Sequence, residues 1–272
     1  MIDPKGLPEG LECFSRIISL IGKRKPAFFL DFDGTLAPIV STPDSAAIPG
    51  PTRDLIRRLS SAYTVCIASG RGLADVQSLV GVPAAYYAAD HGHHIAGPEG
   101  SGVNLEIAPH DSRELEMASY ELGHRLRSIQ GVIVETKGVS LSVHYRQVAP
   151  AERDEVIRVV NELAARSPDL NTVPGKMVLD LVPALAWDKG KAMIWLLKRL
   201  GGRRSTVCPV CIGDDRTDEN MFSAAKHWGV GLIVGEPLWE TLADYRLHGV
   251  DQVAAFLGRF LGAVSFSSGR AG

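Results

Sequence analysis

The sequence predicts an α/β fold in which a doubly wound parallel sheet carries an inserted α+β domain. Three observations predict it. Short, almost wholly apolar runs alternate with helical patterns in the first and last parts of the chain. Polar residues follow directly after several of these runs, and the middle of the chain changes to amphipathic helices followed by alternating strands. Near-continuous apolar strands joined by helices are typical of a parallel sheet covered on both faces.

The elements of the parallel sheet can be placed in order along the chain. Strands are expected over residues 27–31, 64–68, 84–89, 207–212 and 230–234. Helices are expected over residues 51–59, 73–79, 189–200 and 218–226. This order is Rossmann-like, and in such folds ligands bind beyond the carboxyl ends of the strands. We expect the sheet to form a core from residues 1–109 and 184–272.

Residues 110–183 are predicted to form the inserted domain. Two amphipathic helices are each followed by a pair of strands, and in the first pair Leu141 and Val143 alternate with Ser142 and His144. An antiparallel sheet with one apolar face against helices leaves its other face polar. That face is expected to carry Glu135, Lys137, His144, Arg146 and Asp180. It can be simply solvated or it can close over a polar ligand, and the sequence favours neither.

Composition excludes several classes of protein. The 272 residues are 45% hydrophobic and 22% charged with a formal net charge of −2, so a packed core is expected and a broad nucleic-acid surface is not. No apolar run suits a signal or a membrane span, which favours a soluble cytoplasmic protein. Four cysteines are too few for a disulfide scaffold, and Cys208 and Cys211 are expected to be buried hydrophobes in a strand.

Polar residues gather where the predicted strands end, which is the main indication of a single site. The first strand ends in Asp31, with Asp33 and Gly34 next, and the glycine lets the chain turn so that both carboxylates can approach one ligand. The residues that follow the other strands are Ser69, Gly70 and Arg71, then Asp90 and His91, then Asp214 and Asp215. The hydroxyl and backbone N–H groups of residues 69–71 suit phosphate oxygens.

The acidic residues predict a divalent cation. Several carboxylates in one cleft repel unless a proton or a cation compensates, and hard oxygen ligands near a phosphate are what Mg²⁺ prefers. The candidate ligands are Asp31, Asp33, Asp214, Asp215 and Asp218. Helix capping explains Thr217 or Asp218 but not the two acids before them. Lys189 is expected to begin a helix, where a bound anion would offset its charge, although a solvated lysine is the alternative.

Taken together these motifs resemble the haloacid dehalogenase superfamily. They are DxDGT at residues 31–35, Ser69, Lys189, and GDDxTDE at residues 213–219. The resemblance implies a phosphatase with a cap domain in which Asp31 attacks phosphorus to form an aspartyl-phosphate. Asp33 then protonates the leaving alcohol and later activates water. Mg²⁺ would sit on Asp31, Asp214 and the carbonyl of Asp33.

The inserted domain resembles that of the trehalose-6-phosphate phosphatase family. The segments that carry this resemblance are SGR, DHG, VETKGVSLSVHYRQ, GKMVLDLVP and DKGKA, between about residues 27 and 235. It implies that Glu135, Lys137 and Asp180 bind sugar hydroxyls from the cap, with His91 and Gly92 beside the substrate. The family usually has Glu at position 180 and a basic residue at Val182, and both departures bear on which sugar is bound.

Two other functions are consistent with parts of this pattern. One is a phosphatase of the same chemistry acting on another sugar phosphate or glycosyl phosphate. The other is a regulatory domain that binds a sugar phosphate without turnover, which the sequence disfavours because Asp31, Asp33, Asp214, Asp215 and Lys189 are all present. A trehalose-6-phosphate synthase working beside this protein would be a separate chain, since 272 residues leave no room for a glycosyltransferase domain.

Overall fold

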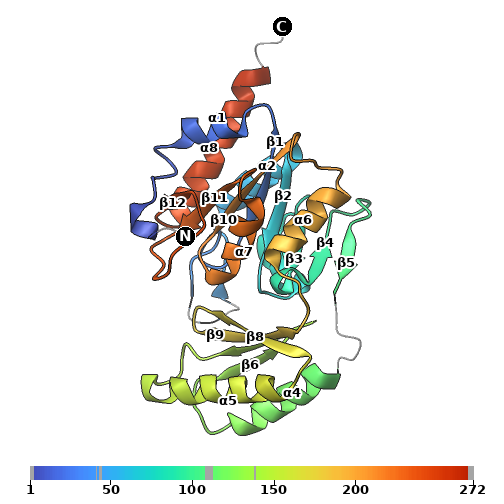
Figure 1. Cartoon of the computed structure of the whole chain (residues 1–272), viewed down its shortest axis with the longest axis vertical. Helices are drawn as coiled ribbons and strands as arrows, with labels where there is room; N and C mark the ends of the chain where they lie inside the picture. The colour runs from blue at the N-terminus through green and yellow to red at the C-terminus, as the bar shows by residue number, and fades with distance from the viewer. Residues whose placement is uncertain (1–2, 41, 43–44, 108–112, 138, 269–272) are drawn as a thin grey trace.

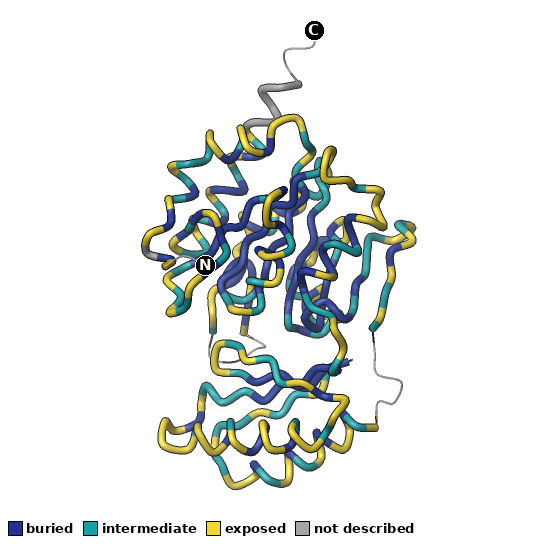
Figure 2. The backbone as a smooth tube through the Cα atoms, viewed as in Figure 1, coloured by how far each residue is buried: buried dark blue, intermediate teal, exposed yellow. Residues whose placement is uncertain are grey.

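The computed structural model describes residues 3–40, 42, 45–107, 113–137 and 139–268. It has two sheets, one of eight strands and one of four. Figure 1 shows the larger sheet in the upper part of the molecule, wrapped by helices, and the smaller sheet beneath it. Figure 2 shows that buried backbone is concentrated in the larger sheet and on the inner side of the smaller domain.

The eight-stranded sheet has the order β12-β11-β10-β1-β2-β3-β4-β5. Its parallel strands are β1 (Lys25–Leu30), β2 (Thr64–Ala68), β3 (Tyr86–Ala89), β10 (Val207–Gly213), β11 (Val230–Val234) and β12 (Tyr245–Leu247). β4 (His94–Ala96) and β5 (Asn104–Glu106) are antiparallel. The five predicted strands are all present, with ends that differ by at most two residues. The three that were not predicted are only three residues long and lie toward the sheet edges.

Helices cover both faces of this sheet because the side chains of β1 alternate. Phe28 points into one buried cluster and Phe29 into the other. The first cluster is built with α1 (Phe14–Ile21), α2 (Gly50–Ala62), α3 (Leu73–Val80) and α8 (Val250–Ser268). The second is built with α6 (Lys189–Arg199) and α7 (Glu219–Ala225). The doubly wound α/β fold predicted from the sequence is therefore confirmed.

The cysteines of the core strands pack as hydrophobic residues. Cys208 lies in the first cluster and Cys211 in the second, because residues three apart on a strand face opposite ways. Cys66 is also buried, and burial raises the pKa of its thiol. These three cysteines are free in the structure.

The smaller domain is a four-stranded antiparallel sheet with the order β6-β7-β9-β8. Its strands are β6 (Ile133–Thr136), β7 (Leu141–His144), β8 (Leu170–Gly175) and β9 (Val178–Pro183). α4 (Arg113–Arg125) and α5 (Arg153–Arg166) pack on one face through a separate hydrophobic cluster. In Figure 1 both helices lie on the side away from the core, so the opposite face of the sheet is turned toward it.

The remaining helical segments are short. They are η1 (Pro4–Gly6), η3 (Asp90–Gly92), η4 (Pro150–Glu152) and η5 (Arg216–Asp218). Of these, η3 and η5 follow core strands and border the site described below. The expected boundary between residues 109 and 110 lies outside the described residues. Among the described helices, none is both long enough and apolar enough to cross a membrane.

Candidate active site

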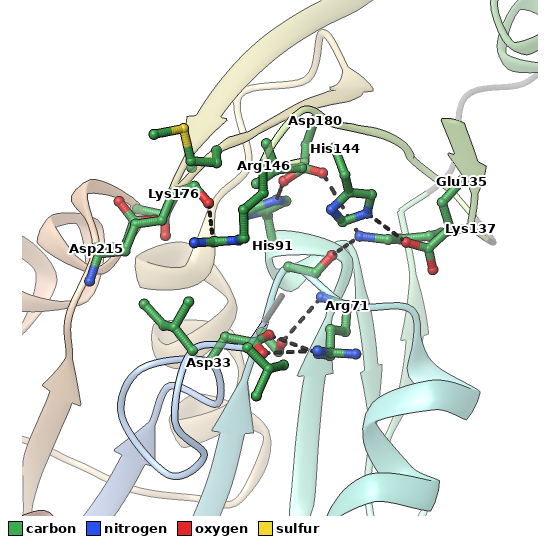
Figure 3. Close-up of a pocket in the computed structure, with 18 of the residues that line it drawn as sticks. Asp33, Arg71, His91, Glu135, Lys137, His144, Arg146, Lys176, Asp180 and Asp215 are labelled. Atoms are coloured by element: carbon green, nitrogen blue, oxygen red, sulfur yellow. Dashed lines mark hydrogen bonds and ion pairs between the residues drawn. The ribbon is translucent and has the colours of Figure 1, made fainter. Parts of the chain in front are cut away.

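A pocket lies between the carboxyl ends of the core strands and the open face of the smaller sheet. Core residues that line it include Asp31, Asp33, Ser69, Gly70, Arg71, His91, Lys189 and Asp215. Residues from the smaller domain that line it include Glu135, Lys137, His144, Arg146, Lys176 and Asp180. Figure 3 shows the two groups facing each other across the pocket. The polar face whose role the sequence left open is thus the roof of a pocket, and the smaller domain is placed as a cap.

Asp31 and Lys189 form the buried centre of the site. Lys189 Nζ donates to Asp31 Oδ1 and to Asp218 Oδ1, both at 2.7 Å. Burial and the nearby charge of Asp218 hold the pKa of Asp31 well above its usual range, with Lys189 acting in the opposite direction. Burial disfavours the ammonium of Lys189, but Asp218 and Asp31 outweigh it and raise the lysine pKa, so Lys189 remains charged. The lysine is not solvated.

Lys189 occupies this position because it begins α6, as the sequence predicts. Asp188 is the N-cap of the helix, and its side chain accepts a hydrogen bond from the backbone N–H of Lys191 at 2.8 Å. Gly190, the second helical residue, has no room for a side chain, since a Cβ there would lie 2.2 Å from the carbonyl oxygen of Asn220. The start of α6 therefore packs tightly against the neighbouring helix and directs Lys189 into the site.

Asp31, Asp214 and Asp218 form a carboxylate cluster. One oxygen of each carboxylate lies within 4.8 Å of the corresponding oxygens of the other two. All three residues are buried. Burial raises the pKa of Asp214 to about 6, with Lys176 opposing this and Asp218 adding to it. Asp214 Oδ1 is buried without a hydrogen-bond partner among the described residues. An unpartnered buried oxygen within a set of hard oxygen donors fits a divalent cation such as Mg²⁺.

Gly34 allows this cluster to form. Its φ is +90°, and a Cβ at this position would lie 1.9 Å from Asp214 Oδ2. The glycine of the strand-end turn therefore serves two purposes, since it provides the left-handed conformation and leaves room for the carboxylate of Asp214.

Asp215 corrects an expectation about helix capping. Thr217 or Asp218 was expected to cap a helix here and Asp215 was not, but Asp215 is the N-cap of η5. Asp218 is at the N-cap position of α7, without a side-chain capping hydrogen bond there. Asp218 completes a capping box, because its Oδ2 accepts from the backbone N–H of Asp215 at 3.0 Å and from that of Asp214 at 2.9 Å. The carboxylate of Asp215 lines the pocket but is not in the cluster with Asp31.

Asp33 and Arg71 form a second charged unit in the pocket floor. Arg71 donates to both oxygens of Asp33, at 2.7 and 2.9 Å (Figure 3). It also donates to Asp75 at 2.8 Å. The backbone N–H of Arg71 donates to Ser69 Oγ at 3.1 Å. The structure therefore brings Asp33 and Ser69 into the same pocket as Asp31, but the carboxylates of Asp31 and Asp33 have different partners.

The turn after β3 belongs to the core and contacts the cap. Asp90, His91 and Gly92 all have positive φ, of 49°, 56° and 95°. Gly92 has no room for a side chain, since a Cβ would lie 2.8 Å from Ala192 Cβ. Ser140 of the cap donates to Asp90 Oδ1 at 2.7 Å. A left-handed backbone at two residues that are not glycine costs free energy, and such strain is concentrated at functional sites.

Asp180 is held by partners from both domains. His91 Nε2 lies 2.8 Å from Asp180 Oδ2, Ser142 donates to Oδ1, and Lys137 Nζ lies 3.8 Å from Oδ1. Lys137 also donates to the carbonyl oxygen of Gly70 at 3.0 Å. Burial of Asp180 opposes ionisation, but the charge of Lys137 and the hydrogen bond with His91 outweigh it and lower the carboxyl pKa.

Replacing Asp180 with Asn should destabilise the fold in a pH-dependent manner. The folded-state pKa of Asp180 lies below its ordinary value of about 3.9, so its ionised form stabilises the fold above that pH. The stabilisation is lost as the pH falls through the folded-state pKa. We expect Asp180→Asn to lower the free energy of unfolding by about 2 kcal/mol at neutral pH, and by progressively less below pH ~4. Urea unfolding across pH measures this, with exposed Asp54→Asn as control, and a deficit independent of pH would contradict it.

Glu135 faces the pocket from β6. Its Oε2 lies 2.9 Å from His144 Nε2, and this hydrogen bond lowers the carboxyl pKa of Glu135 more than its partial burial raises it. The side chain is 37% exposed, so part of the carboxylate remains open to the pocket. Glu135 is thus less enclosed than Asp180.

Sequence reasoning missed Lys176. Its ammonium is ion-paired with Asp214 of the core, although the residue belongs to the cap. The available signal was the turn between the two strands, where Gly175 and Lys176 precede a short apolar strand. Lysine in a hairpin turn is ordinarily solvated, so the pattern alone did not single it out.

Comparisons with known proteins identify relatives of this chain. A model of the trehalose-phosphatase family matches residues 29–244. Trehalose-phosphate phosphatase B of Arabidopsis thaliana is 35% identical over 265 residues, which cover 93% of this chain and 71% of that protein. An uncharacterized glycosyl hydrolase of Mycobacterium tuberculosis is 38% identical over 231 residues. The aligned region covers 84% of this chain but only 17% of that much longer protein.

A solved structure of the C-terminal domain of C. albicans trehalose-6-phosphate phosphatase has the same fold. It superposes with a TM-score of 0.81 at 23% identity, covering 94% of this chain and 98% of that one. The family model spans most of the described core and cap, and the Arabidopsis protein aligns over most of both lengths. The chain therefore belongs to the trehalose-phosphatase family.

Proposed function

We propose that the protein is a Mg²⁺-dependent phosphatase that hydrolyses trehalose 6-phosphate to trehalose and inorganic phosphate. The observation that carries the proposal is the buried Asp31, bound to Lys189 at the floor of a pocket whose roof is the polar face of the cap. The names of the relatives support the substrate. Residues 1–109 and 184–272 form the catalytic core in this proposal, and residues 110–183 form the cap.

The chemistry proceeds in two displacements at phosphorus. An oxygen of Asp31 attacks phosphorus, the bond from phosphorus to the sugar oxygen breaks, and Asp33 gives its proton to that oxygen. Water then attacks the aspartyl-phosphate, Asp33 takes a proton from it, and the carboxylate of Asp31 is restored as phosphate leaves. Arg71 donates to both oxygens of Asp33 and so fixes its position. This arrangement suits the carboxylate that takes a proton from water, whereas Asp33 must give up one of the two hydrogen bonds to carry the proton for the sugar oxygen.

Asp31, Asp214 and Asp218 would hold Mg²⁺, with Asp33 and Asp215 bordering the site. The ion would supply positive charge that lets an anionic carboxylate approach an anionic phosphate. Lys189 would add positive charge on the same side, and Ser69, Gly70 and Arg71, which line the pocket, would bind phosphate oxygens. The sugar would lie toward Glu135, Lys137 and Asp180, with His91 beside it. Gly92, which the sequence also placed beside the substrate, is not among the residues that line this pocket.

A substrate panel tests the function. Phosphate release would be measured with Mg²⁺ from trehalose 6-phosphate, sucrose 6-phosphate, glucose 6-phosphate and a glycosyl phosphoglycerate. We expect a strong kcat/KM preference for the first, loss of activity in EDTA, and recovery when Mg²⁺ is restored. A preference for another member would keep the chemistry and change the substrate, and full activity in chelator would contradict the metal requirement.

Glu135→Ala should separate sugar recognition from chemistry. Glu135 lies in the roof of the pocket, so a small aryl phosphate can react at Asp31 without reaching it. We expect kcat/KM for trehalose 6-phosphate to fall about 100-fold, and that for p-nitrophenyl phosphate to change by less than about threefold. Steady-state kinetics on both substrates provide the comparison. Equal losses on the two would show that Glu135 does not contact the sugar.

A further inference from the structure

The tip of the β8–β9 hairpin is the part of the cap that reaches the carboxylate cluster. The tip is the two-residue turn formed by Lys176 and Met177, between the end of β8 at Gly175 and the start of β9 at Val178. The ammonium of Lys176 is ion-paired with Oδ2 of Asp214. A cation carried by the cap therefore touches a core residue that we propose as a metal ligand.

The position of Lys176 is tied to the position of the cap sheet. Arg146 donates to the carbonyl oxygen of Lys176 at 2.6 Å. The backbone N–H of Tyr145 donates to the carbonyl oxygen of Met177 at 3.0 Å. Gly175 packs beside the core, since a Cβ there would lie 3.5 Å from Asp215 Oδ2. Figure 3 shows Lys176 beside Asp215 at one end of the pocket. The contact of Lys176 with Asp214 therefore depends on how the cap sheet is seated on the core.

The two oxygens of Asp214 have different surroundings. Oδ2 accepts a hydrogen bond from the ammonium of Lys176. Oδ1 is buried without a hydrogen-bond partner among the described residues. A divalent cation bound by Asp31, Asp214 and Asp218 would share this carboxylate with the ammonium. Two cations drawn to one carboxylate repel each other. Asp214 is buried but the Lys176 side chain is 40% exposed, so water screens that repulsion only in part.

We infer that Lys176 and a divalent cation compete for Asp214, so that metal binding loosens the contact between the cap hairpin and the core. The inference rests on the proposed metal site. Coupling between two binding events is reciprocal, so contact of the hairpin with Asp214 must weaken metal binding to the same degree. A phosphate dianion in the pocket relieves the repulsion, which lets the closed hairpin and the metal coexist. Lys176 is a positioning residue that links cap closure to metal and substrate.

Calorimetric titration of the full chain with Mg²⁺ alone tests the competition. We expect Lys176→Gln to bind Mg²⁺ about tenfold more tightly than the wild type, a typical size for coupling between two sites. Lys176→Arg keeps the charge and should retain the wild-type Kd. Lys198→Gln removes the same charge from an exposed position late in α6 and should also retain it. An unchanged or weaker affinity in Lys176→Gln would overturn the inference.

Hydrogen exchange supplies a readout of the hairpin itself. In the wild type, Mg²⁺ without substrate should speed exchange of the backbone amides in residues 170–183, and it should not do so in Lys176→Gln. Slower or unaltered exchange in the wild type would overturn the inference. The outcomes separate the two proposals. If neither the wild type nor Lys176→Gln binds Mg²⁺, both the proposed metal site and this inference are wrong. If the two proteins bind Mg²⁺ equally tightly, the metal site stands and only the competition with Lys176 is ruled out.

Discussion

Asp31→Asn should lower kcat for trehalose 6-phosphate by about 10⁴-fold or more, as removal of a catalytic nucleophile does. An amide oxygen is a poor nucleophile toward phosphorus, whereas the carboxylate of Asp31 is at the floor of the pocket with Lys189 at 2.7 Å. The substitution keeps the shape of the side chain and an oxygen that can accept from Lys189. It also removes a buried negative charge, so we expect the variant to remain folded.

The measurement is phosphate release together with mass spectrometry of protein quenched in acid. Wild-type protein caught during turnover should carry one added phosphoryl group, and Asp31→Asn should not. Asp54→Asn is a matched control, since Asp54 is an exposed aspartate on α2 that pairs with Arg57. Wild-type rates in Asp31→Asn, or a phosphoryl group on a different residue, would refute the assignment of the nucleophile.

The arrangement of residues after the core strands could be predicted because the strands are parallel. Once residues 27–31, 64–68 and 207–212 were recognised as apolar strands of one parallel sheet, their carboxyl ends were expected to lie along one edge of it. Asp31, Ser69 and Asp214 follow those ends, and the structure places Asp31 and Ser69 in one pocket and Asp214 in a cluster with Asp31. The positions of the strands follow from the hydrophobic pattern, which is a local property of the sequence. Their order in the sheet was not predicted and is seen only in the structure.

The pairing of side chains across the two domains could not be predicted in this way. His91 and Asp180 are 89 residues apart, and their contact depends on how the cap is seated on the core. The same holds for Lys176 and Asp214. The alternation in the cap sheet correctly placed Asp180 on the open face, but it could not distinguish solvent from a pocket as the neighbour of that face.

Short-range competition explains the error at Asp215. Asp214, Asp215 and Asp218 are similar carboxylates within five residues, and any of them could cap η5 or contribute to the cluster. The choice is made by the backbone conformation after β10, where Asp215 takes an extended conformation and caps the turn. Only the conformation of the turn, which the sequence pattern does not specify, separates the roles.

Lys189→Met should reduce the stability of the core by about 3 kcal/mol when metal is absent. Lys189 is 2% exposed and donates to Asp31 and Asp218, so its removal leaves two buried carboxylates without their cationic partner. Methionine fills a similar volume, which limits any effect of a cavity. All four tryptophans, at positions 187, 195, 228 and 239, belong to the core. Urea unfolding followed by tryptophan fluorescence therefore reports on the domain that contains Lys189.

Two further variants show whether charge is the cause. Lys189→Met combined with Asp218→Asn should recover part of the lost stability, because it removes one of the unpaired charges. Lys191→Met, at an exposed position in the same helix, should change stability by less than about 0.5 kcal/mol. Mg²⁺ should narrow the deficit of Lys189→Met if the ion binds among the same carboxylates, since it replaces the missing positive charge. A deficit that neither Asp218→Asn nor Mg²⁺ reduces would mean that Lys189 stabilises the core by packing and not by charge.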